Sequence, residues 1–112
     1  MNTQEMIDEG MVDDNMYDFM TDKDLLKKAV KIWGEDAQLF IAAEELAELI
    51  QAISKWKRYH GEEQKQWVIE EMADVLLMIM QLIYIVDIDF TKVREHIHKK
   101  QDIIRERLAK YD

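Results

Sequence analysis

The sequence contains no proline and no cysteine, and only three of its 112 residues are glycine, at positions 10, 34 and 61. Because the turns of β-rich proteins depend heavily on glycine and proline, their scarcity argues against a sandwich or barrel and favours long helices with few connections. The lack of cysteine excludes a disulfide framework, a thiolate metal site and a cysteine nucleophile. A chain of this length is sufficient for one domain with a modest core.

Basic residues and long apolar runs are scarce as well. The chain has 15 Lys and Arg against 24 Asp and Glu, a formal net charge of −9. No basic patch is expected from this balance, so a nucleic-acid polymer is not expected as a partner. The longest apolar run, Val75 to Val86, is interrupted only by Gln81 and is shorter than the roughly 20 residues that span a bilayer. We therefore expect a buried helix in a cytoplasmic protein, with no membrane partner.

The negative charge is concentrated at the start of the chain. The first 22 residues contain seven acids and no base, whereas the remainder contains 17 acids and 15 bases. The opening segment is also rich in methionine, and it lacks the basic and continuous apolar regions of a secretory signal. We predict an acidic, Met-rich N-terminal arm over residues 1–20, either a short amphipathic helix or a flexible segment. The domain is predicted over residues 21–112.

Apolar residues in the domain recur at helical spacing in four segments. The predicted helices run over residues 22–33, 35–59, 63–86 and 90–111. Thr21 or Asp22 is a suitable N-cap for the first of them, and Gly34 is suited to its C-terminal end. Asp89 or Thr91 is a suitable N-cap for the last. The predicted fold class is therefore all-α, with four helices.

Acidic residues occur where the second and third helices are otherwise apolar, in Glu44-Glu45-Leu46-Ala47-Glu48 and Glu70-Glu71-Met72-Ala73-Asp74. Positions three apart share a helix face, so Glu45 lies beside Glu48, and Glu71 lies beside Asp74. Like charges placed among apolar neighbours repel one another and carry a desolvation cost. They require a compensating cation, raised pKa values or exposure in a cleft. An all-oxygen ligand set suits Mg²⁺ or Mn²⁺ better than Zn²⁺. The alternative to a metal site is a helix face on which the acids are simply solvated.

The two acidic segments together resemble the EExxE…ExxD signature of the MazG-like, all-α nucleoside triphosphate pyrophosphohydrolases. The surrounding sequences Glu44-Glu-Leu-Ala-Glu-Leu-Ile-Gln-Ala52 and Glu70-Glu-Met-Ala-Asp-Val-Leu77 are also similar to that family. The segment Lys100-Gln-Asp-Ile-Ile-Arg-Glu-Arg-Leu108 resembles the basic last helix of its small phage and bacterial members. The resemblance covers about residues 23–108.

This resemblance implies hydrolysis of a (deoxy)nucleoside triphosphate to the monophosphate and pyrophosphate. It implies that Mg²⁺, or Mn²⁺ in its place, is held by four carboxylates: Glu45, Glu48, Glu71 and Asp74. Glu44 would then orient the attacking water or support the ligands, and the general base among Glu44, Glu45 and Glu48 is left open. The expected substrate contacts are basic residues beyond Glu48 and in the last helix, with one amide that reads a base edge or caps a helix: Lys55, Arg58, Lys100, Arg107 and Gln38.

Two further alternatives concern the class of protein and its assembly. A carboxylate-bridged di-iron bundle requires Glu-x-x-His on buried helix faces, and the one such spacing, Glu95 to His98, lies in a polar stretch. A non-catalytic helical module that binds a nucleotide or a protein partner is the remaining alternative to an enzyme. The second and third helices are apolar over most of their circumference and should therefore be largely buried. The rest of this short chain is too small to cover them, and the resembled family forms dimers and tetramers. We therefore expect a homodimer or homotetramer that associates through apolar helix faces.

Overall fold

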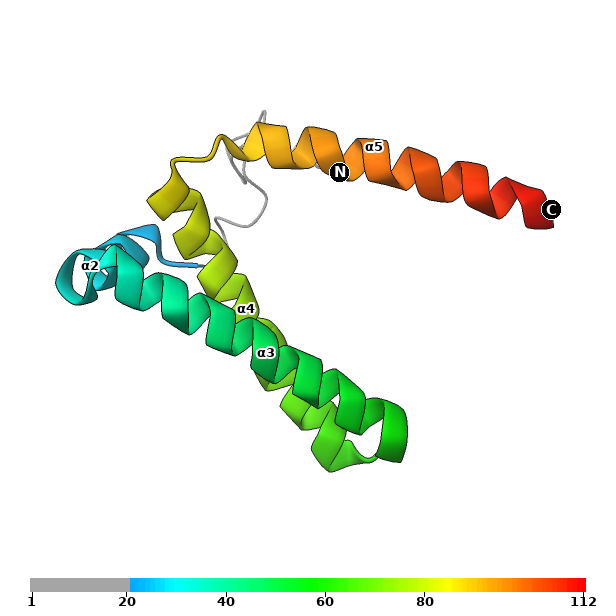
Figure 1. The fold of residues 1–112 in the computed structure, drawn as a ribbon, viewed down its shortest axis with the longest axis horizontal. Coiled ribbons are helices and arrows are strands. Elements are labelled where there is room, and N and C mark those ends of the chain that lie inside the picture. Colours follow the sequence, from blue (N-terminus) through cyan, green and yellow to red (C-terminus); the bar gives the residue numbers. More distant parts are fainter. Residues whose placement is uncertain (1–20) are drawn as a thin grey trace. The chain divides into compact units, whose positions relative to one another are not determined.

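The computed structural model describes residues 21–112, and these contain four α-helices, one short 3₁₀ helix and no strand. The α-helices are α2 (Lys23–Trp33), α3 (Glu35–Tyr59), α4 (Glu62–Val86) and α5 (Phe90–Leu108), followed by the 3₁₀ helix η2 (Ala109–Tyr111) (Figure 1). The predicted all-α fold class is therefore confirmed. The last helix was predicted to run as one element to Tyr111, but its final turn is a 3₁₀ turn, a common ending for an α-helix. The predicted N-terminal arm lies outside the described residues.

The described chain forms two separate units. One contains α2, α3 and α4, and the other begins at Ile88 and contains α5 and η2. In the first unit, α3 and α4 form an antiparallel hairpin, and α2 contacts both of these helices (Figure 1). The functional site described below lies in this hairpin.

Local hydrogen bonds explain where the helices begin. Asp22 is the N-cap of α2, and its side chain accepts a hydrogen bond of 3.1 Å from the backbone N–H of Leu25. Asp89 is the N-cap of α5 and accepts from both the backbone N–H and the hydroxyl of Thr91, at 3.0 and 2.8 Å. These bonds from Thr91 lower the pKa of Asp89. One of the two residues proposed for each N-cap is thus confirmed.

The two connections within the first unit are very short. Gly34 alone separates α2 from α3, and its φ of 93° and ψ of 150° are accessible essentially only to glycine. The α3–α4 turn consists of His60 and Gly61. His60 takes the left-handed conformation with φ 51°, and its N–H donates to the carbonyl of Trp56 at 2.9 Å. Such a short turn fixes α3 and α4 as direct antiparallel neighbours.

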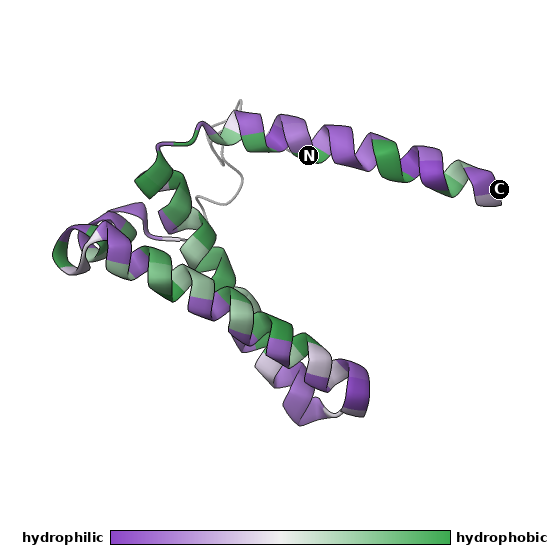
Figure 2. Ribbon diagram, in the orientation of Figure 1, coloured by the Kyte–Doolittle hydropathy of each residue, from purple (hydrophilic) through white to green (hydrophobic). Residues whose placement is uncertain are grey.

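The core of the first unit is small. Its buried apolar side chains are Val30, Ala42, Ala52, Val75 and Met80. The prediction that the second and third helices are largely buried is wrong for the single chain, because many of their apolar side chains are exposed. Figure 2 shows apolar residues along both helices, concentrated in the C-terminal half of α4. None of the helices in residues 21–112 is both long and apolar enough to cross a bilayer.

Helix α5 is polar and largely exposed along its length. Two ion pairs at a spacing of three residues lie on its surface, Lys92 with Glu95 at 3.8 Å and Arg105 with Asp102 at 2.6 Å. Exposed pairs of this kind contribute little to stability, ~0.2–1 kcal/mol each.

Candidate metal centre

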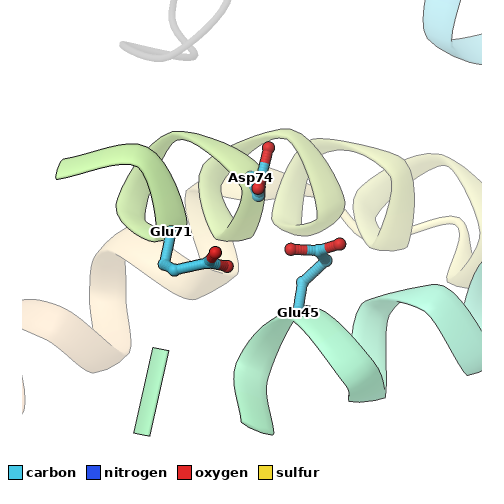
Figure 3. Close-up of side chains that lie close together, drawn as sticks. All are labelled: Glu45, Glu71 and Asp74. Atoms are coloured by element: carbon cyan, nitrogen blue, oxygen red, sulfur yellow. The ribbon is translucent and has the colours of Figure 1, made fainter. Parts of the chain in front are cut away.

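Three of the four predicted metal ligands come together in the middle of the α3–α4 hairpin. Glu45 projects from α3, and Glu71 and Asp74 project from α4, one turn apart. Each of the three side chains offers a carboxylate oxygen, and these oxygens all lie within 4.8 Å of one another. Figure 3 shows the Glu45 carboxylate pointing across from α3 toward the two acids of α4. We call these three residues the carboxylate cluster.

The cluster forms because the hairpin aligns the two acidic segments. The short turn at His60 and Gly61 makes the helices antiparallel, and Glu71 and Asp74, three residues apart on α4, lie on the face toward Glu45 of α3. Glu71 is buried, whereas Glu45 and Asp74 are partly exposed. The acids are therefore held between two helices, with one side of the cluster open to solvent.

The electrostatics of the cluster favour a proton or a cation. Partial burial raises the pKa of Glu45 to about 7, and the negative charges of Asp74 and Glu48 contribute to this rise. The charge of Glu71 is the main cause of a raised pKa at Glu48, which is exposed on the open side of the cluster. Glu48 thus interacts electrostatically with the cluster, although its oxygens are not among those within 4.8 Å.

The cluster contains carboxylate oxygens that are buried without a partner. One oxygen of Glu45 and one of Glu71 are buried and make no hydrogen bond within the described chain. Within residues 21–112, none of the clustered acids forms an ion pair. Because a buried charge without a partner is costly, this donor set fits a divalent cation, and its oxygen-only chemistry fits Mg²⁺ or Mn²⁺.

The other predicted site residues lie at different distances from the cluster along the chain. Glu44 is exposed next to Glu45 on α3, and its charge contributes to the raised pKa of Glu48. Lys55 and Arg58 lie near the C-terminal end of α3, where both cations are 5.9 Å from the centroid of the Tyr59 ring. The structure places Lys100 and Arg107 on α5, in the other unit.

Gln38 lies two turns before Glu45 on α3, and only 3% of its surface is exposed. Its side-chain nitrogen has no hydrogen-bond partner within residues 21–112. Gln81 lies two turns after Asp74 on α4 and is equally buried, and its side-chain oxygen also lacks a partner in this part of the chain. Of these two residues, only Gln38 was predicted from the sequence. Gln38 precedes Glu45 by seven residues, and Gln81 follows Asp74 by seven residues, so the antiparallel register that places Glu45 opposite Asp74 also places Gln38 opposite Gln81. This register is the signal that could have identified Gln81.

A cavity lies on the same hairpin, close to the α3–α4 turn. It has a volume of about 330 Å³ and is lined by Lys55, Tyr59, Glu63, Gln64 and Trp67. Only Lys55 of these was predicted as a site residue. Of the other four, Tyr59 ends α3, and Glu63, Gln64 and Trp67 lie in the first two turns of α4. Their proximity depends on the short turn between the helices, which periodicity alone does not predict.

The fold and the cluster together define an all-α protein with a carboxylate site suited to a divalent metal. The family model described as "MazG nucleotide pyrophosphohydrolase domain" matches residues 35–107, and the chain belongs to this family. The matched region contains the carboxylate cluster and the cavity. No curated protein and no solved structure shows a significant match to the chain.

Proposed function

We propose that the protein hydrolyses a (deoxy)nucleoside triphosphate between its α- and β-phosphates, releasing the monophosphate and pyrophosphate. The observation that carries this proposal is the cluster of Glu45, Glu71 and Asp74, with two buried oxygens lacking a partner, in a chain of the MazG family. Anhydride hydrolysis of this kind depends on positioning and on neutralising the charge of the phosphate oxygens. A cluster of carboxylates contributes to that chemistry when it holds divalent cations.

In this proposal, Mg²⁺ is held by Glu45, Glu48, Glu71 and Asp74, and Mn²⁺ is an alternative. When bound, the metal supplies neutralisation of the phosphate oxygens and a lowered pKa for a coordinated water. Glu48 completes the ligand set in this proposal, because it is exposed on the open side and close enough for the charge of Glu71 to raise its pKa.

The glutamates of α3 orient the attacking water and accept its proton. Glu44 is exposed beside the cluster and orients the attacking water. The water oxygen forms a bond to phosphorus as the bridging P–O bond breaks, and a carboxylate of the segment Glu44, Glu45 or Glu48 accepts the proton. The products are the nucleoside monophosphate and pyrophosphate.

The proposed substrate contacts extend from the cluster along the protein. Lys55 and Arg58 are both near the cavity end of α3 and contribute positive charge there. Lys100 and Arg107 of α5 are proposed to contact the polyphosphate. Gln38 is one candidate contact for the base: it lies two turns from Glu45, on the side away from Lys55. Such a contact requires its buried side-chain nitrogen, which has no partner within residues 21–112, to become accessible.

We further propose that the protein functions as a homodimer or homotetramer. An apolar stripe at spacings of three and four residues follows one face of α3, and all its members are exposed: Leu39, Ala43, Leu46, Ile50 and Ile53. A second exposed stripe on α4 includes Met72, Ile79 and Val86. Apolar helix faces of this extent are typical of helix–helix packing, and a second copy of the chain supplies matching faces.

A pyrophosphate-release assay tests the proposed activity. The substrates are the canonical ribo- and deoxyribonucleoside triphosphates, each with Mg²⁺ and with the metal removed by chelation. We expect pyrophosphate release that depends on Mg²⁺. Substituting a residue that only supports a metal ligand typically costs ~10–100-fold, so Glu45→Gln and Asp74→Asn, which change the ligands themselves, should lower the release by more than this. Glu70→Gln is the matched control, because Glu70 is an exposed neighbour of Glu71 that lies outside the cluster.

Two results would contradict the proposal. Undiminished turnover in Asp74→Asn would show that the cluster is not the metal site of the reaction. Binding of Mg²⁺ and nucleotide without any pyrophosphate release would indicate a non-catalytic nucleotide-binding module.

A further inference from the structure

The cavity at the end of the hairpin lies on the same face of the helix pair as the carboxylate cluster. On α4, Gln64 precedes Glu71 by seven residues, and Trp67 precedes Asp74 by seven residues. Seven residues are two turns, or ~10 Å along a helix. The cavity and the cluster are thus two places along one seam between α3 and α4. This inference rests on the proposed function, in which the cluster holds the phosphate end of a nucleotide.

The chemistry of the cavity suits an uncharged, planar group better than a phosphate. Lys55 and Glu63 carry opposite charges, so the lining has no net positive charge to attract an anion. Two aromatic side chains, Tyr59 and Trp67, supply flat apolar surface. Its volume of about 330 Å³ lies at the lower end of the range for small-molecule sites. A nucleobase is a planar group of this kind, and a nucleotide presents it at the opposite end from the phosphates.

The two aromatic residues are not equivalent. Lys55 and Arg58 each place a cationic group 5.9 Å from the centroid of the Tyr59 ring, so this ring already makes cation–π contacts. No such contact involves Trp67 within the described residues, and its indole is partly exposed. Trp67 is therefore the residue available for stacking.

We propose that this cavity, and not the region of Gln38 on the other side of the cluster, binds the base of the nucleotide, with Trp67 as the stacking surface and Glu63 as the residue that selects the base. An ionised carboxylate only accepts hydrogen bonds, so Glu63 favours a base edge that presents N–H donors. Guanine presents two adjacent donors, a ring N–H and an amino group, while adenine and cytosine each present an amino group. Uracil and thymine present one N–H between two carbonyl oxygens, which a carboxylate repels. The expected order of affinity is guanine first, adenine and cytosine next, and uracil and thymine last.

In this arrangement Gln64 has a supporting role. Its amide both donates and accepts hydrogen bonds, so it adapts to a carbonyl or a ring nitrogen beside the group read by Glu63. Lys55 contacts the nucleoside rather than the polyphosphate, because it lines the cavity and lies two turns from Glu48.

The test is a binding measurement that involves no turnover. Non-hydrolysable α,β-methylene analogues of GTP, ATP, CTP and UTP are titrated calorimetrically into the full chain with Mg²⁺. Wild type is expected to bind the guanine analogue most tightly. Glu63→Gln is expected to weaken guanine binding by roughly 10–100-fold, the typical effect of losing a hydrogen bond to a charged group, with little effect on the uracil analogue. Trp67→Leu is expected to weaken all four.

Glu62→Gln is the matched control. Glu62 precedes Glu63 in the first turn of α4, is exposed and does not line the cavity, so its change in charge should leave the ranking of bases intact. Helical content measured by circular dichroism verifies that each variant is folded. Equal guanine affinity in Glu63→Gln and Glu62→Gln would overturn the inference, as would equal binding of all four analogues or binding of none. Because hydrolysis is measured separately, failure of the pyrophosphate-release assay counts against the proposed function and leaves the base ranking to decide this inference.

Discussion

Glu45 of α3 and Asp74 of α4 hold carboxylate oxygens within 4.8 Å of each other, and the charge of Asp74 contributes to raising the pKa of Glu45 to about 7. Two acids in this position oppose folding when both are ionised and favour it when a cation lies between them. The same pair therefore costs stability in the metal-free protein and supplies ligands to the metal-bound one. Both consequences can be measured.

The first prediction concerns metal binding and thermal stability. Asp74→Asn removes one negative charge from the cluster, so the metal-free variant should melt at a higher temperature than metal-free wild type. Mg²⁺ should raise the melting temperature of wild type, since a ligand present at a hundred times its dissociation constant stabilises the folded state by ~2.7 kcal/mol. The Mg²⁺-induced shift should be much smaller in Asp74→Asn. Differential scanning calorimetry with and without chelator measures both effects.

Glu70→Gln provides the comparison for this experiment. It removes the same charge from an exposed position outside the cluster and should leave the Mg²⁺-induced shift unchanged. A wild-type protein whose melting temperature does not respond to millimolar Mg²⁺ or Mn²⁺ would count against the metal centre.

The second prediction concerns pH. The pKa of Glu45 rises from its ordinary value of 4.5 to about 7 on folding, so the folded state binds more protons than the unfolded state between these values. The stability that this proton supplies is complete below pH 4.5 and is lost as the pH rises through 7. Glu48, whose pKa is also raised, acts in the same direction. Asp89 acts in the opposite direction, but below its ordinary value of 3.8.

Urea unfolding of the metal-free protein across pH 4.5 to 8 measures this effect. Glu45→Gln cannot ionise at this position, so its stability relative to wild type should increase steadily over the range. Parallel stability curves for the two proteins would contradict the raised pKa, and saturating Mg²⁺ should reverse the trend in wild type only.

Much of this arrangement follows from residue patterns, and what does not follow has a physical cause. Asp22 and Gly34 lie at the predicted helix boundaries, because capping is a local interaction between neighbours in the chain. Glu45, Glu71 and Asp74 were expected to share one site because of the resemblance to the family, and the short connection between adjacent antiparallel helices brings them together. Glu63 and Gln64 were not predicted to line a cavity, because their position depends on how the turn orients α4 against α3. His60 takes a left-handed conformation in this turn, which the sequence does not signal as strongly as a glycine would.

Burial was predicted less well than helix position. An apolar stripe predicts that a helix packs against something, but it does not say whether the partner is in the same chain. Ile50 is 68% exposed in the single chain, although it belongs to a helix that was expected to be largely buried. The same stripe is the basis of the proposed self-association.

The third prediction tests that association. Ile50→Lys places a charge in the middle of the exposed α3 stripe and should shift the protein toward the monomer, because a buried lysine at an interface lacks a partner. Gln51→Lys introduces the same side chain at the adjacent exposed position, outside the stripe, and should retain the wild-type mass. Light scattering at micromolar concentration measures the mass of each. A monomeric wild-type protein would contradict the proposed dimer or tetramer.

The fourth prediction concerns the connection between α2 and α3. Gly34 has φ 93° and ψ 150°, and an added Cβ would meet no atom within 4 Å. Any loss of stability in Gly34→Ala therefore arises from backbone strain and not from a clash, and we expect it to be ~1–3 kcal/mol. Gly61→Ala is the matched control, because Gly61 has φ −87°, and its added Cβ displaces only the flexible end of Gln64. Urea denaturation should show a clear loss for Gly34→Ala and little change for Gly61→Ala, whereas equal losses would mean that the conformation of Gly34 is not what stabilises the junction.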